Sequence, residues 1–288
     1  MAARTGIFAA QTSRVWRGRT WRFVLLLFML VMAMGYVQTC LAFWGHDAAE
    51  LPSAATAWIG NHAVMQTPVF GLFAYFLMVP CSSAIFADSL LLDVRSRRAN
   101  ALAARSSERG YVISSAVLAF ASAFAIVLAA LLFSQALAYL AFPAAAFQDA
   151  FSSGFNTSAS YADAASEVSG TDGLLLVVLR AENRPIFNLL MALYEALWSG
   201  IMALVAFAIS LYVKRSRILV LGVPTLVLLV MSNFLPSELN VMATYLGLGF
   251  TWHAGATVLG FLGLPALVLA AACVAIAAAF VLRRDVLL

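Results

Sequence analysis

The chain has 288 residues, of which 64% are hydrophobic and only 10% are charged, and its formal net charge is +4. Soluble domains contain roughly 25% charged residues, so this chain lacks the polar side chains that would cover a globule in water. The composition excludes a soluble enzyme, and we interpret the positive balance as contact with anionic lipid headgroups, not with nucleic acid.

The first 22 residues mix arginines with large apolar side chains, among them Phe8, Trp16 and Trp21. This pattern is typical of a helix in the membrane interface, with aromatic rings at headgroup depth and arginines reaching water. We therefore expect residues 1–22 to form a cytoplasmic interfacial helix. A disordered basic tail is the alternative.

Six long apolar segments follow within residues 23–288. A helix needs about 20 apolar residues to cross a hydrocarbon core of about 30 Å, and it satisfies its backbone polar groups within one segment. The expected spans are about 23–44, 67–87, 111–142, 187–213, 217–235 and 256–282. The sequence therefore predicts an all-α membrane protein with six transmembrane helices.

The basic residues predict the orientation of these spans. With six spans, both termini and two of the loops share one side of the membrane. All of the 17 Lys and Arg residues lie on that side except Arg180 and Arg184. Because cytoplasmic loops carry the excess of basic residues, we expect both termini in the cytoplasm and a multi-pass protein of the plasma membrane of a bacterium.

The loop 88–110 between the second and third spans is the most charge-dense part of the chain. An apolar stripe of Leu90, Leu91, Val94 and Leu102 is consistent with a short amphipathic helix that lies on the membrane surface. We expect the charged residues of this loop to face a soluble partner; they are Asp93, Arg95, Arg97, Arg98, Arg105, Glu108 and Arg109. The third span that follows exceeds one hydrocarbon thickness, so it must tilt or project into the cytoplasm.

Two features belong to the outer half of the protein. Residues 143–185 are the longest polar segment and read as a loosely packed outer loop. The fourth span carries Glu195, about two turns from its outer end. An ionisable residue at that depth is a candidate for a transport pathway. The alternative, which we favour, is a protonated or hydrogen-bonded glutamate between helices.

Enzyme motifs are absent from the sequence. There is no GxSxG nucleophile elbow, no HExxH metal motif and no GxxxxGK[ST] phosphate loop. The three cysteines form no CxxC pair, and no cluster of carboxylates accompanies the three histidines within the spans. We therefore expect no catalytic activity, no metal and no cofactor on this chain.

Several motifs together resemble the permease subunits of type-2 ABC exporters. A basic segment precedes the first span, and Asp88 ends the second. The loop then reads DxRSxRxNALxARSSERxYV from Asp93 to Val112 and leads into the long third span. The last span ends in Arg283, Arg284 and Asp285.

The resemblance implies that this chain forms the substrate pathway with a second permease subunit, either the same chain or a related one. Separate cytoplasmic ATPase subunits would bind ATP and Mg²⁺ and would dock on the loop 88–110, which would act as a coupling helix. The interfacial helix would be their second contact. The alternatives are a self-contained secondary transporter and a membrane sensor or immunity protein without transport.

Overall fold

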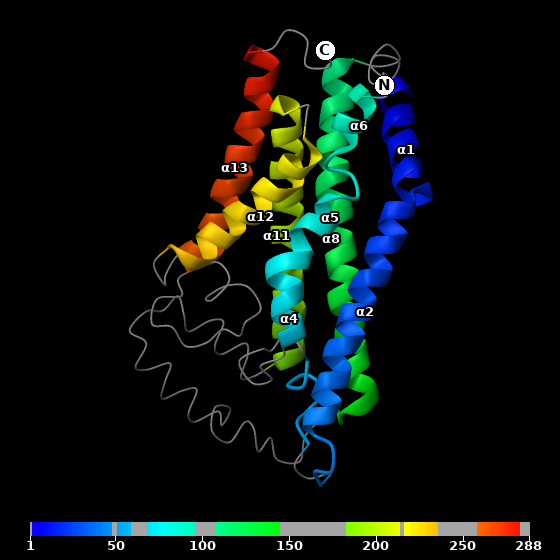
Figure 1. The fold of residues 1–288 in the computed structure, drawn as a ribbon, viewed down its shortest axis with the longest axis vertical. Coiled ribbons are helices and arrows are strands. Elements are labelled where there is room, and N and C mark those ends of the chain that lie inside the picture. The colour runs from blue at the N-terminus through cyan, green and yellow to red at the C-terminus, as the bar shows by residue number, and fades with distance from the viewer. Residues whose placement is uncertain are drawn as a thin grey trace.

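The computed structural model describes residues 2–47, 51–58, 68–95, 107–144, 183–213, 216–235 and 258–282 (Figure 1). All regular secondary structure in these ranges is helical. Four helices are long and apolar enough to cross a membrane: α2 (Arg19–Ala42), α8 (Glu108–Ala141), α11 (Arg184–Tyr212) and α13 (Val258–Leu282). The described part of the chain is therefore all-helical, and its four long apolar helices indicate a membrane-embedded protein.

The two other expected spans coincide with shorter apolar helices, Pro68–Ser83 and α12 (Arg217–Asn233). The first of these is unevenly wound, with α4 (Pro68–Leu72), the π-helical turn η1 (Phe73–Leu77) and α5 (Met78–Ser83) in succession. Pro80 has no N–H to donate, and its ring crowds the carbonyl one turn earlier. The wide turn directly before α5 accommodates this crowding.

Helix α11 occupies the centre of the bundle, where it contacts α8, α13, α12 and α5. The largest of its fully buried side chains are Trp198 and Phe207. Because lipid is as apolar as leucine, helices in a membrane associate chiefly through close packing. Gly200 shows this directly, since a Cβ at this position would lie 2.9 Å from the ring of Phe120 on α8.

Helix α1 (Ala2–Arg17) forms where a helix was expected ahead of the first span. It runs beside the first part of α8, and α2 continues along the rest (Figure 1). The break falls at Gly18, whose extended ψ of 149° ends the helical path. At 1.5 Å per residue the 34 residues of α8 rise about 51 Å. The sequence predicts a span longer than the hydrocarbon core, and α1 packs beside the first part of this long helix.

Candidate functional site

Helix α6 (Ser89–Arg95) forms at the start of the loop 88–110, where a short helix was expected. Leu90 and Leu91 are buried, and Leu90 belongs to an apolar cluster with Tyr111 of α8 and Leu211 of α11. The expectation that this stripe lies on the membrane surface is therefore wrong for Leu90 and Leu91. These two leucines are buried by the protein itself, and the packing of Leu90 fixes α6 against the bundle.

Asp93 lies on the same buried face of α6 and is only 1% exposed. Both of its carboxylate oxygens accept hydrogen bonds from Nη1 of Arg14, each at 2.7 Å. The hydroxyl of Tyr111 donates to Oδ2 at 2.6 Å. A buried carboxylate is tolerated when it is paired and hydrogen-bonded in this way. Asp93 therefore joins α6 to α1 and α8.

A second ion pair joins the same end of the bundle to α12. Asp88, at the end of the turn after α5, pairs with Nε of Arg217 at the start of α12. The side chain of Asp88 is almost fully buried, whereas that of Arg217 is half exposed. Burial raises the pKa of Asp88, and Arg217 opposes this shift only in part. The cost of removing the carboxylate from water therefore offsets part of the favourable free energy of the ion pair.

A neutral contact adds to the attachment of α1. The buried Nε2 of Gln11 donates to Oγ of Ser115 on α8 at 2.9 Å. Gln11 lies one turn before Arg14, so the two side chains hold consecutive turns of α1. We call the residues Gln11, Arg14, Asp88, Asp93, Tyr111, Ser115 and Arg217 the basal cluster. It ties α1, the turn before α6, α6, α8 and α12 together at the base of the arginine-rich loop.

The structure describes only some of the other loop residues that were expected to face a partner. Arg97, Arg98 and Arg105, and the side chain of Arg95, lie outside the described residues. Arg109 is exposed and Glu108 is partly buried, both in the first turn of α8. Ser107 caps that turn by accepting a hydrogen bond from the Gly110 N–H at 3.1 Å. Of the described members, Asp93 is buried within the chain and Arg109 is the one most open to a partner.

Glu195 lies on the buried side of α11 and is 1% exposed. Neither of its carboxylate oxygens has a hydrogen-bond partner among the described residues. The nitrogen of the neighbouring Trp198 ring also lacks one. Of the protonated or hydrogen-bonded glutamate that we favoured, the hydrogen bond between helices is therefore not formed within the described part of the chain.

Polar side chains flank Glu195 on the same helix, and these are bonded. Two turns earlier, Nδ2 of Asn188 donates to the Ala55 carbonyl at 2.8 Å and to Oε1 of Gln135 at 3.0 Å. One turn later, Ser199 exchanges a hydrogen bond of 2.8 Å with Ser82 of α5. α11 thus carries a short line of polar groups through the bundle, in which Glu195 is the member without a partner in the described ranges.

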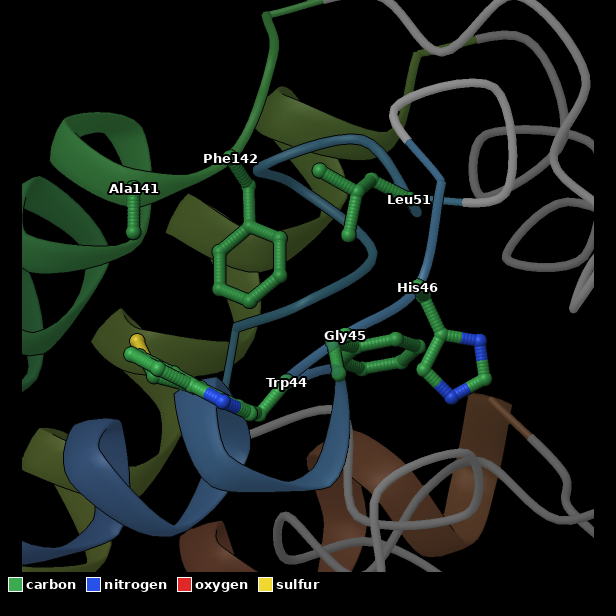
Figure 2. Close-up of a pocket in the computed structure, with 8 residues that line it drawn as sticks. Trp44, Gly45, His46, Leu51, Ala141 and Phe142 are labelled. Atoms are coloured by element: carbon green, nitrogen blue, oxygen red, sulfur yellow. The ribbon is translucent and has the colours of Figure 1, made fainter.

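A pocket of about 470 Å³ lies at the other end of α2 and α8. Figure 2 shows Phe142 and Leu51 facing the turn of Trp44, Gly45 and His46. Gly45 has φ +85°, a conformation that favours glycine. The lining is mainly apolar, and no three His, Cys, Asp or Glu side chains within the described ranges could hold a metal ion together. The pocket is therefore a defined cavity with few polar side chains that could bind a ligand specifically.

Two tryptophans after the end of α2, Trp44 and Trp58, have different environments. Trp44 is 82% exposed, as an anchor in lipid headgroups would be. Trp58 is 1% exposed, and its ring N–H donates to Oγ of Ser134 on α8 at 2.8 Å. Trp58 is therefore a core residue that fastens the segment after α2 onto α8.

Comparison with known proteins finds no match: no family model, no curated protein and no solved structure aligns with this chain. The resemblance to exporter permeases therefore depends on the residues of the loop 88–110 and the pattern of spans. What the chain does must be argued from its own geometry.

Sequence reasoning missed most of the basal cluster. Arg14 and Asp93 are 79 positions apart, and no local pattern links them. One signal was available, because Asp93 follows Leu90 by one helical turn and so lies on the apolar stripe of α6. A carboxylate on a stripe that packs against protein needs a partner, and an arginine is the usual one.

Proposed function

We propose that this chain is the transmembrane permease subunit of an ATP-driven exporter, and that cytoplasmic ATPase subunits dock on the loop 88–110. The basal cluster supports this proposal. A loop that receives force from a partner must have a stiff base. Here α6 is fixed by packing and by the part-buried ion pair of Asp93 with Arg14, and the turn before it is fixed by the part-buried pair of Asp88 with Arg217. The partner would bind ATP and Mg²⁺, and this chain would contribute the pathway.

The cluster offers a route for the force. A displacement of α6 would act on α8 through Tyr111 and on α1 through Arg14, because both donate to Asp93. The ion pair of Asp88 with Arg217 would carry the same displacement to α12. Packed elements with fixed hydrogen bonds move together, so the loop and the attached helices would respond as one body.

The position of the charged side chains also supports the proposed topology. Arg14, Arg109 and Arg217 lie on elements that meet at one end of the bundle, which we assign to the cytoplasm. In this topology Pro68–Ser83 and α12 complete six spans, and both termini are cytoplasmic. The pathway would form between this chain and a second permease subunit in the plasma membrane.

Charge reversal within the loop tests the proposed docking. We expect Arg98→Glu with Arg105→Glu to reduce the ATPase activity that co-purifies with the chain at least tenfold, since acidic groups on the partner would then be repelled. The control is Arg180→Glu, which reverses the charge of one arginine on the opposite face of the predicted topology. Equal activity in all three preparations, or none with the unmodified chain, would contradict the proposal.

A self-contained secondary transporter is the second candidate, and Glu195 favours it. An ionisable group in the bundle without a partner in the described ranges could bind a proton or cation during transport. In that case the purified chain alone would accumulate substrate in vesicles under a proton gradient, and Glu195→Gln would abolish the accumulation. The first proposal expects no accumulation until the ATPase and ATP are added, and little effect of Glu195→Gln.

A further inference from the structure

A groove of about 540 Å³ lies between the bend joining α1 to α2 and the face of α8 beside it. None of its lining residues belongs to the basal cluster. One wall comes from the bend and the other from α8, and the principal lining residues are Phe8, Trp16, Trp21, Leu118, Ala121 and Ala125. Nearly all of the lining surface is therefore carbon.

The two walls are shaped differently. Ala121 and Ala125 are one turn apart on α8 and are both exposed, so they leave a shallow, smooth surface. Opposite them, Trp16 and Trp21 meet edge to face with ring centroids 4.9 Å apart. The ring N–H of Trp21 donates to the Trp16 carbonyl at 2.6 Å, which holds that ring in place. The groove is a preformed slot between indole rings and small side chains.

Three exposed arginines are close in the sequence to the two tryptophans of the groove. Arg17, Arg19 and Arg22 are exposed and lie within three residues of Trp16 or Trp21. Neither α1 nor α2 contains an acidic residue. Arg14 differs from these three because Asp93 already neutralises it. Three exposed arginines thus flank the groove-lining tryptophans in the sequence, and neither helix carries a carboxylate.

We propose that this groove binds one phospholipid with an anionic headgroup. An acyl chain would lie between Trp16 and the alanine surface of α8, and the three arginines would bind the phosphate and the headgroup charge. Guanidinium groups bind phosphate oxygens through paired hydrogen bonds, and tryptophan is suited to the boundary between headgroups and chains. The lipid would join α1 to α8 beyond the reach of Gln11 and Arg14.

Lipid retention tests the site in the full-length protein. The chain is reconstituted in vesicles of equal amounts of phosphatidylglycerol and phosphatidylcholine, extracted in mild detergent, and its retained lipids are counted by mass spectrometry. We expect the unmodified chain to retain phosphatidylglycerol at least threefold over phosphatidylcholine. Filling the slot with Ala121→Leu and Ala125→Leu should lower retained phosphatidylglycerol by about one molecule per chain.

The control for filling the slot is Ala136→Leu, an equal change at an exposed position of α8 away from the groove. It should retain lipid as the unmodified chain does. Arg22→Gln should lower the preference for phosphatidylglycerol without lowering total lipid. A second readout uses phospholipids brominated in the acyl chain, which should quench tryptophan fluorescence less in the filled variant than in the control.

Three results would overturn the proposal. If the unmodified chain retained both lipids equally, the arginines would have no role in binding. The filled variant could retain as much phosphatidylglycerol as the Ala136→Leu control, which would place the lipid elsewhere. A change of oligomeric state in the filled variant, with lipid retention unchanged, would make a second copy of the chain the occupant.

Discussion

Asp93 and Glu195 are equally buried carboxyl groups, each 1% exposed, yet their surroundings are opposite. Asp93 accepts hydrogen bonds from Arg14 and Tyr111, whereas Glu195 has no partner among the described residues. Asp93 lies at the end of the bundle, where long cationic side chains keep one end in water. Glu195 lies inside a span, where an arginine would itself have to be desolvated.

The comparison shows that burial alone does not identify a functional carboxyl group. Asp93 can be explained by what it holds together, because its removal would leave Arg14 without its ion pair and the Tyr111 hydroxyl without the acceptor to which it donates. Glu195 contributes no such contact within the described ranges. We therefore infer that Asp93 stiffens the basal cluster, and we expect Glu195 to be dispensable for stability.

The largest expected effect is that of Asp93→Ala. Removing one partner of a buried pair leaves the other desolvated, so the free energy of unfolding should fall by about 3 kcal/mol, at the low end of the usual range because Arg14 is 39% exposed. An unfolding titration in mixed detergent micelles measures this change. Arg109→Ala, at an exposed position beside the loop, is the control and should have little effect.

Tyr111→Phe removes one of the hydrogen bonds to Asp93 and leaves its ion pair with Arg14. A hydrogen bond to a charged group contributes roughly 1.5–3 kcal/mol, so we expect a loss of about 2 kcal/mol. The same unfolding titration applies. In the double variant Asp93→Ala with Tyr111→Phe, the two losses should be less than additive, and strict additivity would mean that the contact is not formed.

The packing of α11 against α8 can be compared with an open glycine position. Gly200→Ala places a methyl group 2.9 Å from the Phe120 ring, so overpacking should cost about 1 kcal/mol. Gly222→Ala on α12 meets nothing within 4 Å, and the better helix propensity of alanine should stabilise by up to about 1 kcal/mol. Equal effects on thermal unfolding would argue against close contact at Gly200.

Glu195→Gln is expected to have the smallest effect. Because no hydrogen bond of the carboxyl group is found in the described ranges, the free energy of unfolding should change by less than about 1 kcal/mol. Asp93→Asn is the matched change and should be clearly destabilising, since an amide cannot replace the charge that pairs with Arg14. Equal losses in the two variants would erase the distinction between these carboxyl groups.

The spans could be predicted from the sequence because lipid imposes length and apolarity on any helix that crosses it. That requirement located α2, α8, α11 and α13, and the excess length of α8 was also visible. The turn after Ser83 was not, since Ile85 to Ala87 are apolar and read as a continuation of the span. Hydropathy shows whether a segment is apolar enough to be buried in lipid or protein. It does not show where a helix ends when the turn that ends it is itself apolar and buried.

The candidate site was less predictable than the spans. The charged loop could be located, but the pairing of Asp93 with Arg14 depends on α1 folding back along α8, which is a tertiary contact. The core position of Trp58 could not be predicted for a similar reason, because an aromatic residue near the end of a span is equally suited to headgroups and to a core position with a hydroxyl such as that of Ser134.

Accessibility of position 109 tests the central claim most directly. Arg109→Cys would be introduced after replacing Cys40, Cys81 and Cys273, and labelled with a membrane-impermeant maleimide. We predict labelling in inside-out vesicles and not in intact cells, with protection when the ATPase partner is bound. Labelling from outside intact cells would contradict a cytoplasmic coupling loop.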